Sequence, residues 1–351
     1  MILAPGDQPS GDANGWPPKG LKPMTKDHLR PISKALAVLA VSAAMACAPA
    51  GTGDTPAGEA GAQLVIPAPT LDELSAATFE GIYDHPVTLA HGQWEGEPFV
   101  EGGASRPTVG LVGNFRLAGD LDDDGREEAV VLLWESSGGS GTRLYLAAMA
   151  HRDEGIEDLG TVLIGDRVQV RAARLDGQRI VFDLVQAGPD DSMCCPSQKA
   201  SKSWELGAEG LDLVATEVTG TFSLADLEGP EWVLTELGWE QPAPQGAEVT
   251  LRFEEGKVVG HGGCNRYFGG VTAGEIPGSL SFSAMGATRM ACPDPAMELE
   301  QRYLSALAAA SNHSFLAGRL VLTCQTGEGL VALIFSPREP APASGAETTG
   351  S

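Results

Sequence analysis

Basic residues are scarce in this sequence. Its 351 residues include 23 Lys and Arg against 47 Asp and Glu, which gives a formal net charge of −24. A surface of this sign repels phosphate backbones and anionic lipid headgroups, and it favours solubility. Nucleic acid is therefore excluded as a partner. The length leaves room for two domains.

Long apolar runs are also missing. The run 35–46 has a dozen residues, fewer than the roughly 20 that a membrane-spanning helix needs. It follows three basic residues and ends at Cys47, which is the layout of a secretory signal. The stretch Ala44-Met-Ala-Cys47 resembles a bacterial lipobox, with Ala44 in place of the usual leucine, and it predicts lipidation of Cys47. The alternative is an ordinary signal peptide cut near Ala46 or Ala50.

The ends of the chain divide into segments by composition. Residues 1–23 are rich in Pro and Gly and do not fit in front of a signal, so we expect translation to start at Met24. Residues 24–47 would be a lipoprotein-type signal peptide, and residues 48–69 a flexible tether. Residues 338–351 form a similar tail. These segments predict a lipoprotein of the cell envelope, held in the outer membrane by its lipid alone and facing the periplasm.

Strand patterns dominate residues 70–217. Short runs of apolar and β-branched residues alternate with Gly- and Asp-rich turn clusters, and Asp176-Gly177 between two runs predicts a hairpin. A helix is expected only over Leu71–Ala77, capped by Thr70. Because strand follows strand without helices between them, we predict an antiparallel β domain, a sandwich or an open barrel. The runs are 129–134, 143–147, 168–172 and 179–185.

A second domain is predicted over residues 229–337, after a junction at 216–230. Strand patterns precede and follow one helical pattern, which begins with Asp294 as N-cap and Pro295 at the first helical position. Its apolar residues recur at a period of 3.6 up to Ala310. The sequence thus predicts a mainly β chain with an α+β second domain, in which one helix packs on an antiparallel sheet.

Three motifs of the second domain occur in a recognisable order. Val259–Gly269 contains a GCN loop, Ala287–Cys292 contains T-x-M-x-C, and Glu298 with Tyr303-Leu304 gives E-x-x-x-x-Y-L on the helix. Together they resemble the META/HslJ family, over about residues 229–337. The resemblance implies a small α+β domain of bacterial envelope and secreted proteins, linked to heat-shock and drug-tolerance contexts. It supplies no catalytic mechanism.

Cys264 of the GCN loop and Cys292 of the second motif are expected to form a disulfide. In an exported protein two cysteines are more often bonded than catalytic. The bond would close a loop of about 27 residues and contribute about 3 kcal/mol. A Cys264 nucleophile would need a base, and His261, three residues away on a strand, points to the opposite face. An envelope hydrolase is therefore the disfavoured alternative.

Asn265 and Arg266 directly follow Cys264. Consecutive glycine N–H groups can form an anion-binding nest, so the pair is a weak candidate for ligand binding. In the interpretation we favour, Asn265 takes a left-handed turn position. Arg266 would then pair with a local carboxylate such as Glu298.

An acidic loop in the first domain carries the sharpest metal-binding pattern. Aspartates occupy alternate positions from 120 to 124, Gly125 allows a sharp bend after them, and a glutamate occupies the ninth position. Calcium prefers six to eight oxygen ligands on a compact loop. Val131 at the twelfth position excludes an EF-hand, and the loop is similar to the D-x-D-x-D-G-x-x-[DE] turns of FG-GAP-type β repeats. The alternative is a solvated acidic hairpin. The candidate Ca²⁺ ligands are Asp120, Asp122, Asp124, the Arg126 carbonyl and Glu128.

Cys194 and Cys195 are adjacent, and their pairing stays open. They can bond to each other, to Cys324 or between chains, or stay free. The strain of a bond between neighbours argues against the first choice. If Cys47 is acylated, five thiols remain and at least one lacks an intramolecular partner.

Three functions fit these features. The first is a non-enzymatic META/HslJ-like lipoprotein in envelope maintenance or stress tolerance, which binds an envelope protein or a ligand. The second is a calcium-dependent module that binds envelope glycan or peptide. The third is an envelope hydrolase, which the scattered histidines do not support.

Overall fold

The computed structural model describes residues 66–338, except residues 140, 154, 193, 247 and 328. The predicted signal peptide, Cys47 and residues 48–65 of the tether lie outside these residues, as does the tail from 339 onward. Within the described part, no helix has both the length and the apolar character to cross a membrane.

Antiparallel sheets build the first part of the chain. A six-stranded sheet has the order β3-β4-β6-β7-β8 with β5 on β6, a four-stranded sheet has the order β12-β11-β10-β9, and β1 pairs with β2. The strands are β1 (Thr78–Phe79), β2 (Val87–Thr88), β3 (Gln93–Glu95), β4 (Thr108–Leu111), β5 (Leu117–Gly119), β6 (Glu128–Ser136), β7 (Arg143–Arg152), β8 (Gly155–Asp166), β9 (Gln169–Asp176), β10 (Arg179–Gln186), β11 (Gln198–Gly207) and β12 (Gly210–Thr221).

Strand β6 is buried on both faces, which explains its unbroken apolar sequence. Val131 and neighbours on one face join a core with Leu74 and Phe79. Val130 and Leu132 on the other face join a core with residues of the four-stranded sheet. Side chains of a strand alternate between faces, so both cores draw on one run. The predicted antiparallel β domain is confirmed. Of its two alternatives, a sandwich or an open barrel, the core shared by two sheets corresponds to the sandwich.

The folded part begins earlier than predicted. Ile66 forms a bridge with Arg126, and Ala68 is buried. The Arg116 guanidinium donates hydrogen bonds to the carbonyls of Pro69 (2.6 Å) and Ala68 (2.9 Å). The last four residues of the tether predicted over 48–69 thus have backbone partners in the structure. Helix α1 (Leu71–Leu74) follows behind the predicted Thr70 cap and is shorter than predicted.

Nine strands and one helix form the second part. The strand order is β17-β16-β15-β14-β13-β21-β20-β19, with β18 on β16. A bridge between Ser279 and Asn312 joins the two ends of this order, so the sheet is nearly closed into a barrel. The elements are the 3₁₀ helix η1 (Leu224–Leu227), β13 (Glu231–Leu237), β14 (Val249–Glu254), β15 (Lys257–Gly262), β16 (Arg266–Ala273), β17 (Leu280–Phe282), β18 (Gly286–Ala287), α2 (Ala296–Ala308), β19 (Ala310–Leu316), β20 (Arg319–Thr326) and β21 (Gly329–Arg338).

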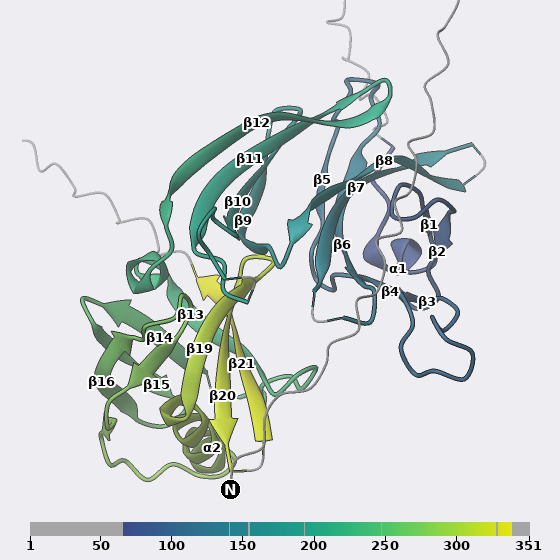
Figure 1. Cartoon of the computed structure of the whole chain (residues 1–351). Helices are drawn as coiled ribbons and strands as arrows, with labels where there is room; N and C mark the ends of the chain where they lie inside the picture. Colours follow the sequence, from purple (N-terminus) through teal and green to yellow (C-terminus); the bar gives the residue numbers. More distant parts are fainter. Residues whose placement is uncertain are drawn as a thin grey trace, which may run out of the picture. The chain divides into compact units, whose positions relative to one another are not determined.

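Helix α2 packs on this sheet against β20 and β15 (Figure 1), as the α+β prediction requires. Leu299, Tyr303 and Leu307 are buried in the core that the strands share. Asp294 is not the N-cap. Pro295 holds that position and the helix starts at Ala296, so the first turn has no side-chain cap.

Candidate functional site

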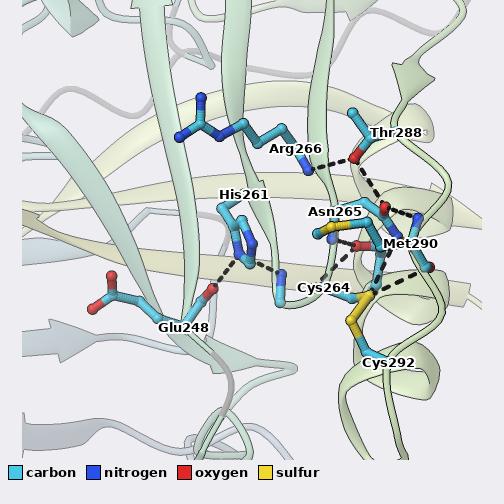
Figure 2. Close-up of a disulfide and its surroundings, with 10 residues drawn as sticks. Glu248, His261, Cys264, Asn265, Arg266, Thr288, Met290 and Cys292 are labelled. Atoms are coloured by element: carbon cyan, nitrogen blue, oxygen red, sulfur yellow. Dashed lines mark hydrogen bonds between the residues drawn. A yellow bond between two sulfur atoms is a disulfide. The ribbon is translucent and has the colours of Figure 1, made fainter.

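The cysteine loop connects β15 to β16 and is buried. Cys264 and Asn265 are exposed by only 2% and 3%. The Sγ atoms of Cys264 and Cys292 lie 1.98 Å apart, so the two predicted partners are at disulfide distance. Figure 2 shows this bond joining the loop to the segment before α2. The thiol that would have been the nucleophile is thus used as a covalent link.

The carboxylate of Glu300, on α2, accepts hydrogen bonds from the cysteine loop. One carboxylate oxygen, Oε2, accepts the backbone N–H groups of Asn265 (2.5 Å) and Cys264 (3.3 Å). The other, Oε1, accepts the side-chain amide of Asn265 (2.9 Å). Asn265 Oδ1 in turn accepts from the Thr288 hydroxyl (2.9 Å) and from Met290 N–H (2.7 Å). The GCN and T-x-M-x-C motifs and the helix therefore meet in one hydrogen-bond network.

The predicted geometry of Asn265 and Arg266 needs correction. Asn265 is not in the left-handed region; Gly263, with φ +107°, makes the bend instead. Among the described residues no carboxylate lies within ion-pair distance of Arg266, so the predicted pair with Glu298 is absent. The buried carboxylate is Glu300. Arg266 is exposed and extends away from the disulfide (Figure 2).

Glu300 is not among the predicted site residues, because the helix carries two glutamates close together. Glu298, which is exposed, belongs to the recognised motif, whereas Glu300 is exposed by only 8%. A signal was present: Glu300 lies three residues before Tyr303, on the edge of the apolar face. With its amide oxygen and amide nitrogen both engaged, Asn265 is suited to fixing the loop rather than to binding a ligand.

His261 does not act on Cys264 in this arrangement. Its Nδ1 atom lies 3.2 Å from Gly263 N and 3.2 Å from the Glu248 carbonyl (Figure 2). An imidazole nitrogen cannot accept from one group and donate to the other at once, so one of these contacts is used at a time. Either way the ring is directed to backbone groups.

The acidic loop connects β5 to β6 and brings three of the five predicted ligands together. One carboxylate oxygen from each of Asp120, Asp122 and Asp124 lies within 4.8 Å of the other two. Backbone N–H groups inside the loop hold these side chains: Gly125 N–H donates to Asp120 Oδ2 (3.0 Å), and Asp124 N–H donates to Asp122 Oδ1 (3.1 Å). Gly125 provides the bend at φ +84°.

Glu128, the fourth carboxylate of the motif, is fully buried at the start of β6. Its Oε2 accepts from Leu121 N–H (2.8 Å), between the first two aspartates. Its Oε1 has no hydrogen-bond partner, and neither has the buried Oδ1 of Asp120. Burial raises the pKa of Glu128, and the nearby charges of Asp122 and Asp124 raise it further.

The remaining cysteines differ from the expectation. Cys194 and Cys195 lie at disulfide distance from each other, with Sγ atoms 2.17 Å apart, although the strain of a bond between neighbours argues against this pairing. The neighbouring loop is fixed by Asp191, whose carboxylate accepts from Gly188 N–H and Ser197 N–H (2.7 Å each). Cys324 is a free, buried thiol, and burial raises its pKa to about 12. It has no access to a partner.

A groove of about 1070 Å³ was not anticipated from the sequence. Trp134 and Trp239 line it, and Trp239 is exposed by 57%. An ion pair of Glu236 and Arg319 (2.8 Å) lies within it. The Trp134 ring rests on Gly110, where a Cβ would lie 2.4 Å from the ring. The polar lining includes Gln93, Asn114, Thr235 and Ser336.

Comparison with known proteins identifies the second part of the chain. Residues 225–334 match the family model of the META domain. An NMR structure of a protein from Burkholderia xenovorans is 27% identical over 32% of this chain and 85% of that one, with a TM-score of 0.27. No curated protein matches the sequence. The predicted META/HslJ resemblance is confirmed for the C-terminal part.

Proposed function

We propose that this protein, whose residues 225–334 are a META domain, is an exported, non-enzymatic lipoprotein that serves envelope maintenance and stress tolerance by binding a partner or a ligand. The observation that carries the proposal is the state of the cysteines. Four of the five in the described residues lie in two pairs at disulfide distance, and the fifth is buried. Stable disulfides belong to oxidising compartments outside the cytosol.

Cys47 fits this account from the sequence side. It follows the apolar run of the predicted signal peptide, and acylation would give it a role that needs no disulfide partner. One lipid chain gives only weak membrane binding, whereas several chains give firm binding. A lipoprotein carries several acyl chains and would therefore be firmly anchored. The folded part would then be held near the membrane by residues 48–65.

Binding is favoured over catalysis by how the META motifs are used. Cys264 is bonded, and the polar groups of Asn265 and Glu300 are directed to each other and to backbone. The groove with Trp134 and Trp239 is the candidate binding face. Aromatic faces combined with neutral hydrogen-bonding groups suit an uncharged polar ligand or a protein segment.

Mass spectrometry and cross-linking test this proposal. The mature protein should begin at an acylated Cys47, and Cys47→Ser should abolish the lipid mass. Alkylation of the unreduced, unfolded protein should modify Cys324 alone. A photo-reactive residue at Trp239 should capture an envelope component in cells, whereas one at Phe268, exposed by 63% on β16, should not. An unprocessed, unlipidated chain, or equal labelling from both positions, would contradict the proposal.

A second candidate function, a calcium-dependent binding module, is favoured by the two unpartnered carboxylate oxygens of the acidic loop. In that case capture from position 239 should require calcium and be lost in a chelator. Capture that does not change in a chelator would support the first proposal alone.

A further inference from the structure

The acidic loop holds more negative charge than its surroundings balance. Asp120, Asp122, Asp124 and Glu128 place four carboxylates at one turn. Two arginines face them: Arg152 Nη1 lies 3.6 Å from Asp124 Oδ2, and Arg126 Nε lies 3.9 Å from it. Neither distance is that of a hydrogen bond. These four carboxylates and two guanidinium groups leave an excess of two negative charges, and Asp123 and Glu127 of the same turn add to it. A divalent cation would offset this excess.

Two buried carboxylate oxygens at this turn have no hydrogen-bond partner, which is a stronger indication of a cation site than the charge alone. They are Oε1 of Glu128, a residue with no exposure, and Oδ1 of Asp120. Buried polar atoms are nearly always paired, and an unpaired carboxylate oxygen is especially costly. In each case the carboxylate's other oxygen accepts a backbone N–H of the loop, from Leu121 or Gly125. Each carboxylate is thus fixed by one oxygen and keeps the other free.

The spacing of the oxygens suits a hard cation of calcium size. Ca²⁺–oxygen distances are about 2.4 Å, so two ligands on opposite sides of the ion are about 4.8 Å apart. Oxygens of Asp120, Asp122 and Asp124 fall within this limit. Glu128 is not part of this group of oxygens. We propose that the loop between β5 and β6 binds one Ca²⁺ through these three aspartates and the Arg126 carbonyl, and that Glu128 Oε1 reaches the ion through a bound water, as the ninth position of a calcium loop often does.

The same loop forms backbone contacts with the first described residues of the chain. A bound cation would therefore also stabilise these residues. Glu127 N–H donates to the Ile66 carbonyl (2.9 Å), and Ile66 forms a parallel bridge with Arg126. His151, on β7, lies with Nδ1 3.1 Å from the Pro67 carbonyl. Binding of Ca²⁺ at the Arg126 carbonyl fixes the backbone on which Ile66 rests. The ion therefore clamps the point where the described chain enters the sandwich.

Calorimetric titration of the purified chain with Ca²⁺ tests the site. We expect one ion to bind with a Kd of about 10⁻⁴ M, in the range of extracellular modules, and the melting temperature to rise by about 5 °C at millimolar Ca²⁺. Asp122→Asn should weaken binding by at least about tenfold while its side-chain oxygen still accepts from Asp124. Asp123→Asn is the matched control, because Asp123 is exposed, outside the cluster and at φ +60°, which Asn tolerates.

Glu128→Gln separates a cation site from a merely structural carboxylate. Gln keeps the oxygen that accepts from Leu121 but removes a buried charge. In chelator the variant should therefore melt above the wild type, and in Ca²⁺ below it. Hydrogen exchange at Glu127 N–H should slow with Ca²⁺ in the wild type and stay unchanged in the variant.

Several results would overturn the assignment. One is the absence of binding heat and of thermal stabilisation at Ca²⁺ concentrations up to about 10-fold above the expected Kd. Another is an equal response to Mg²⁺. A third is Ca²⁺ binding of wild-type strength by both Asp122→Asn and Glu128→Gln. The site does not depend on export or lipidation. Failure of the lipid test would leave it standing, and its failure would leave the lipoprotein proposal intact.

Discussion

His313 on β19 is buried with both ring nitrogens unpartnered. It is exposed by 4%, and its ring lies 5.0 Å from Phe222. Burial lowers the pKa of this imidazole to about 4, although the backbone contact at Gly278 and the charge of Asp226 act in the opposite direction. The folded state therefore favours the neutral ring, and protonation favours the unfolded state.

His313 should make stability fall in mild acid. In the unfolded chain the imidazole binds a proton below about pH 6.5, whereas in the folded protein it stays neutral down to about pH 4. Folding therefore becomes less favourable as the pH falls from about 6.5 to about 4. The loss levels off there, at about 3 kcal/mol. His313→Phe keeps a ring against Phe222 and should remove this part of the slope. Urea unfolding at several pH values measures it, with the exposed His91→Asn as control; equal slopes in both variants would contradict the assignment.

At the scale of elements, Glu300 joins α2 to the cysteine loop beside the disulfide. Glu300→Gln would present an amide N–H₂ to donors that now face a carboxylate, and we expect a loss of about 2 kcal/mol. Glu298→Gln, two residues earlier on the exposed side, should cost under about 0.5 kcal/mol. Thermal unfolding under oxidising conditions compares the two variants. Equal losses would mean that Glu300 does not support the loop.

The elements also show what the sequence could predict. Strands such as β6 and β10 were found because burial makes their sequences apolar. Strand β12 was not found, since most of its residues are exposed and it lies at a sheet edge. It runs to Thr221, so the junction predicted from residue 216 starts too early. Strand β19 was missed because helix α2 ends at Ala308, directly before it.

The candidate sites also differ in how far the sequence predicts them. The acidic loop was predicted from spacing alone, because its candidate ligands lie within nine residues and one turn brings the three aspartates together. The Glu300 contact joins residues 35 apart, and the groove joins side chains from several strands. No local pattern encodes such contacts, because they arise only when the barrel closes. The pairing of Cys194 with Cys195 was judged by strain alone, without the loop that surrounds it.

At the scale of the molecule, the described residues 66–338 belong to one compact unit, so the META barrel and the β sandwich are not independent. Phe315 N–H donates to Gln169 Oε1 (3.0 Å), and Gly318 N–H donates to the Val170 carbonyl (2.9 Å). Asp226 adds charge to this junction: its carboxylate lies 2.6 Å from Lys199 Nζ and 3.4 Å from Arg171 Nη2. We therefore expect one cooperative unfolding transition.

Asp226 should be a sensitive point of that transition. Burial alone would raise its pKa, but the hydrogen bonds from Lys199 and Ser223 and the Arg171 charge hold the pKa below 3.8. Its contribution is thus complete above the unfolded pKa and is lost as the pH falls through the folded value. Asp226→Asn would leave two half-buried cations without a carboxylate, at a cost of about 1–3 kcal/mol at pH 7.

The matched control is Glu205→Gln, because the Arg179–Glu205 pair is equally short (2.6 Å) but about half exposed. An exposed pair contributes under about 1 kcal/mol, so this variant should melt close to the wild type. Scanning calorimetry at pH 7 and pH 3 compares the three proteins. The stability difference between Asp226→Asn and the wild type should narrow as the pH falls through the lowered folded pKa of Asp226. Two separate transitions in the wild type, or equal losses in the two variants, would show that the sandwich and the barrel unfold without this coupling.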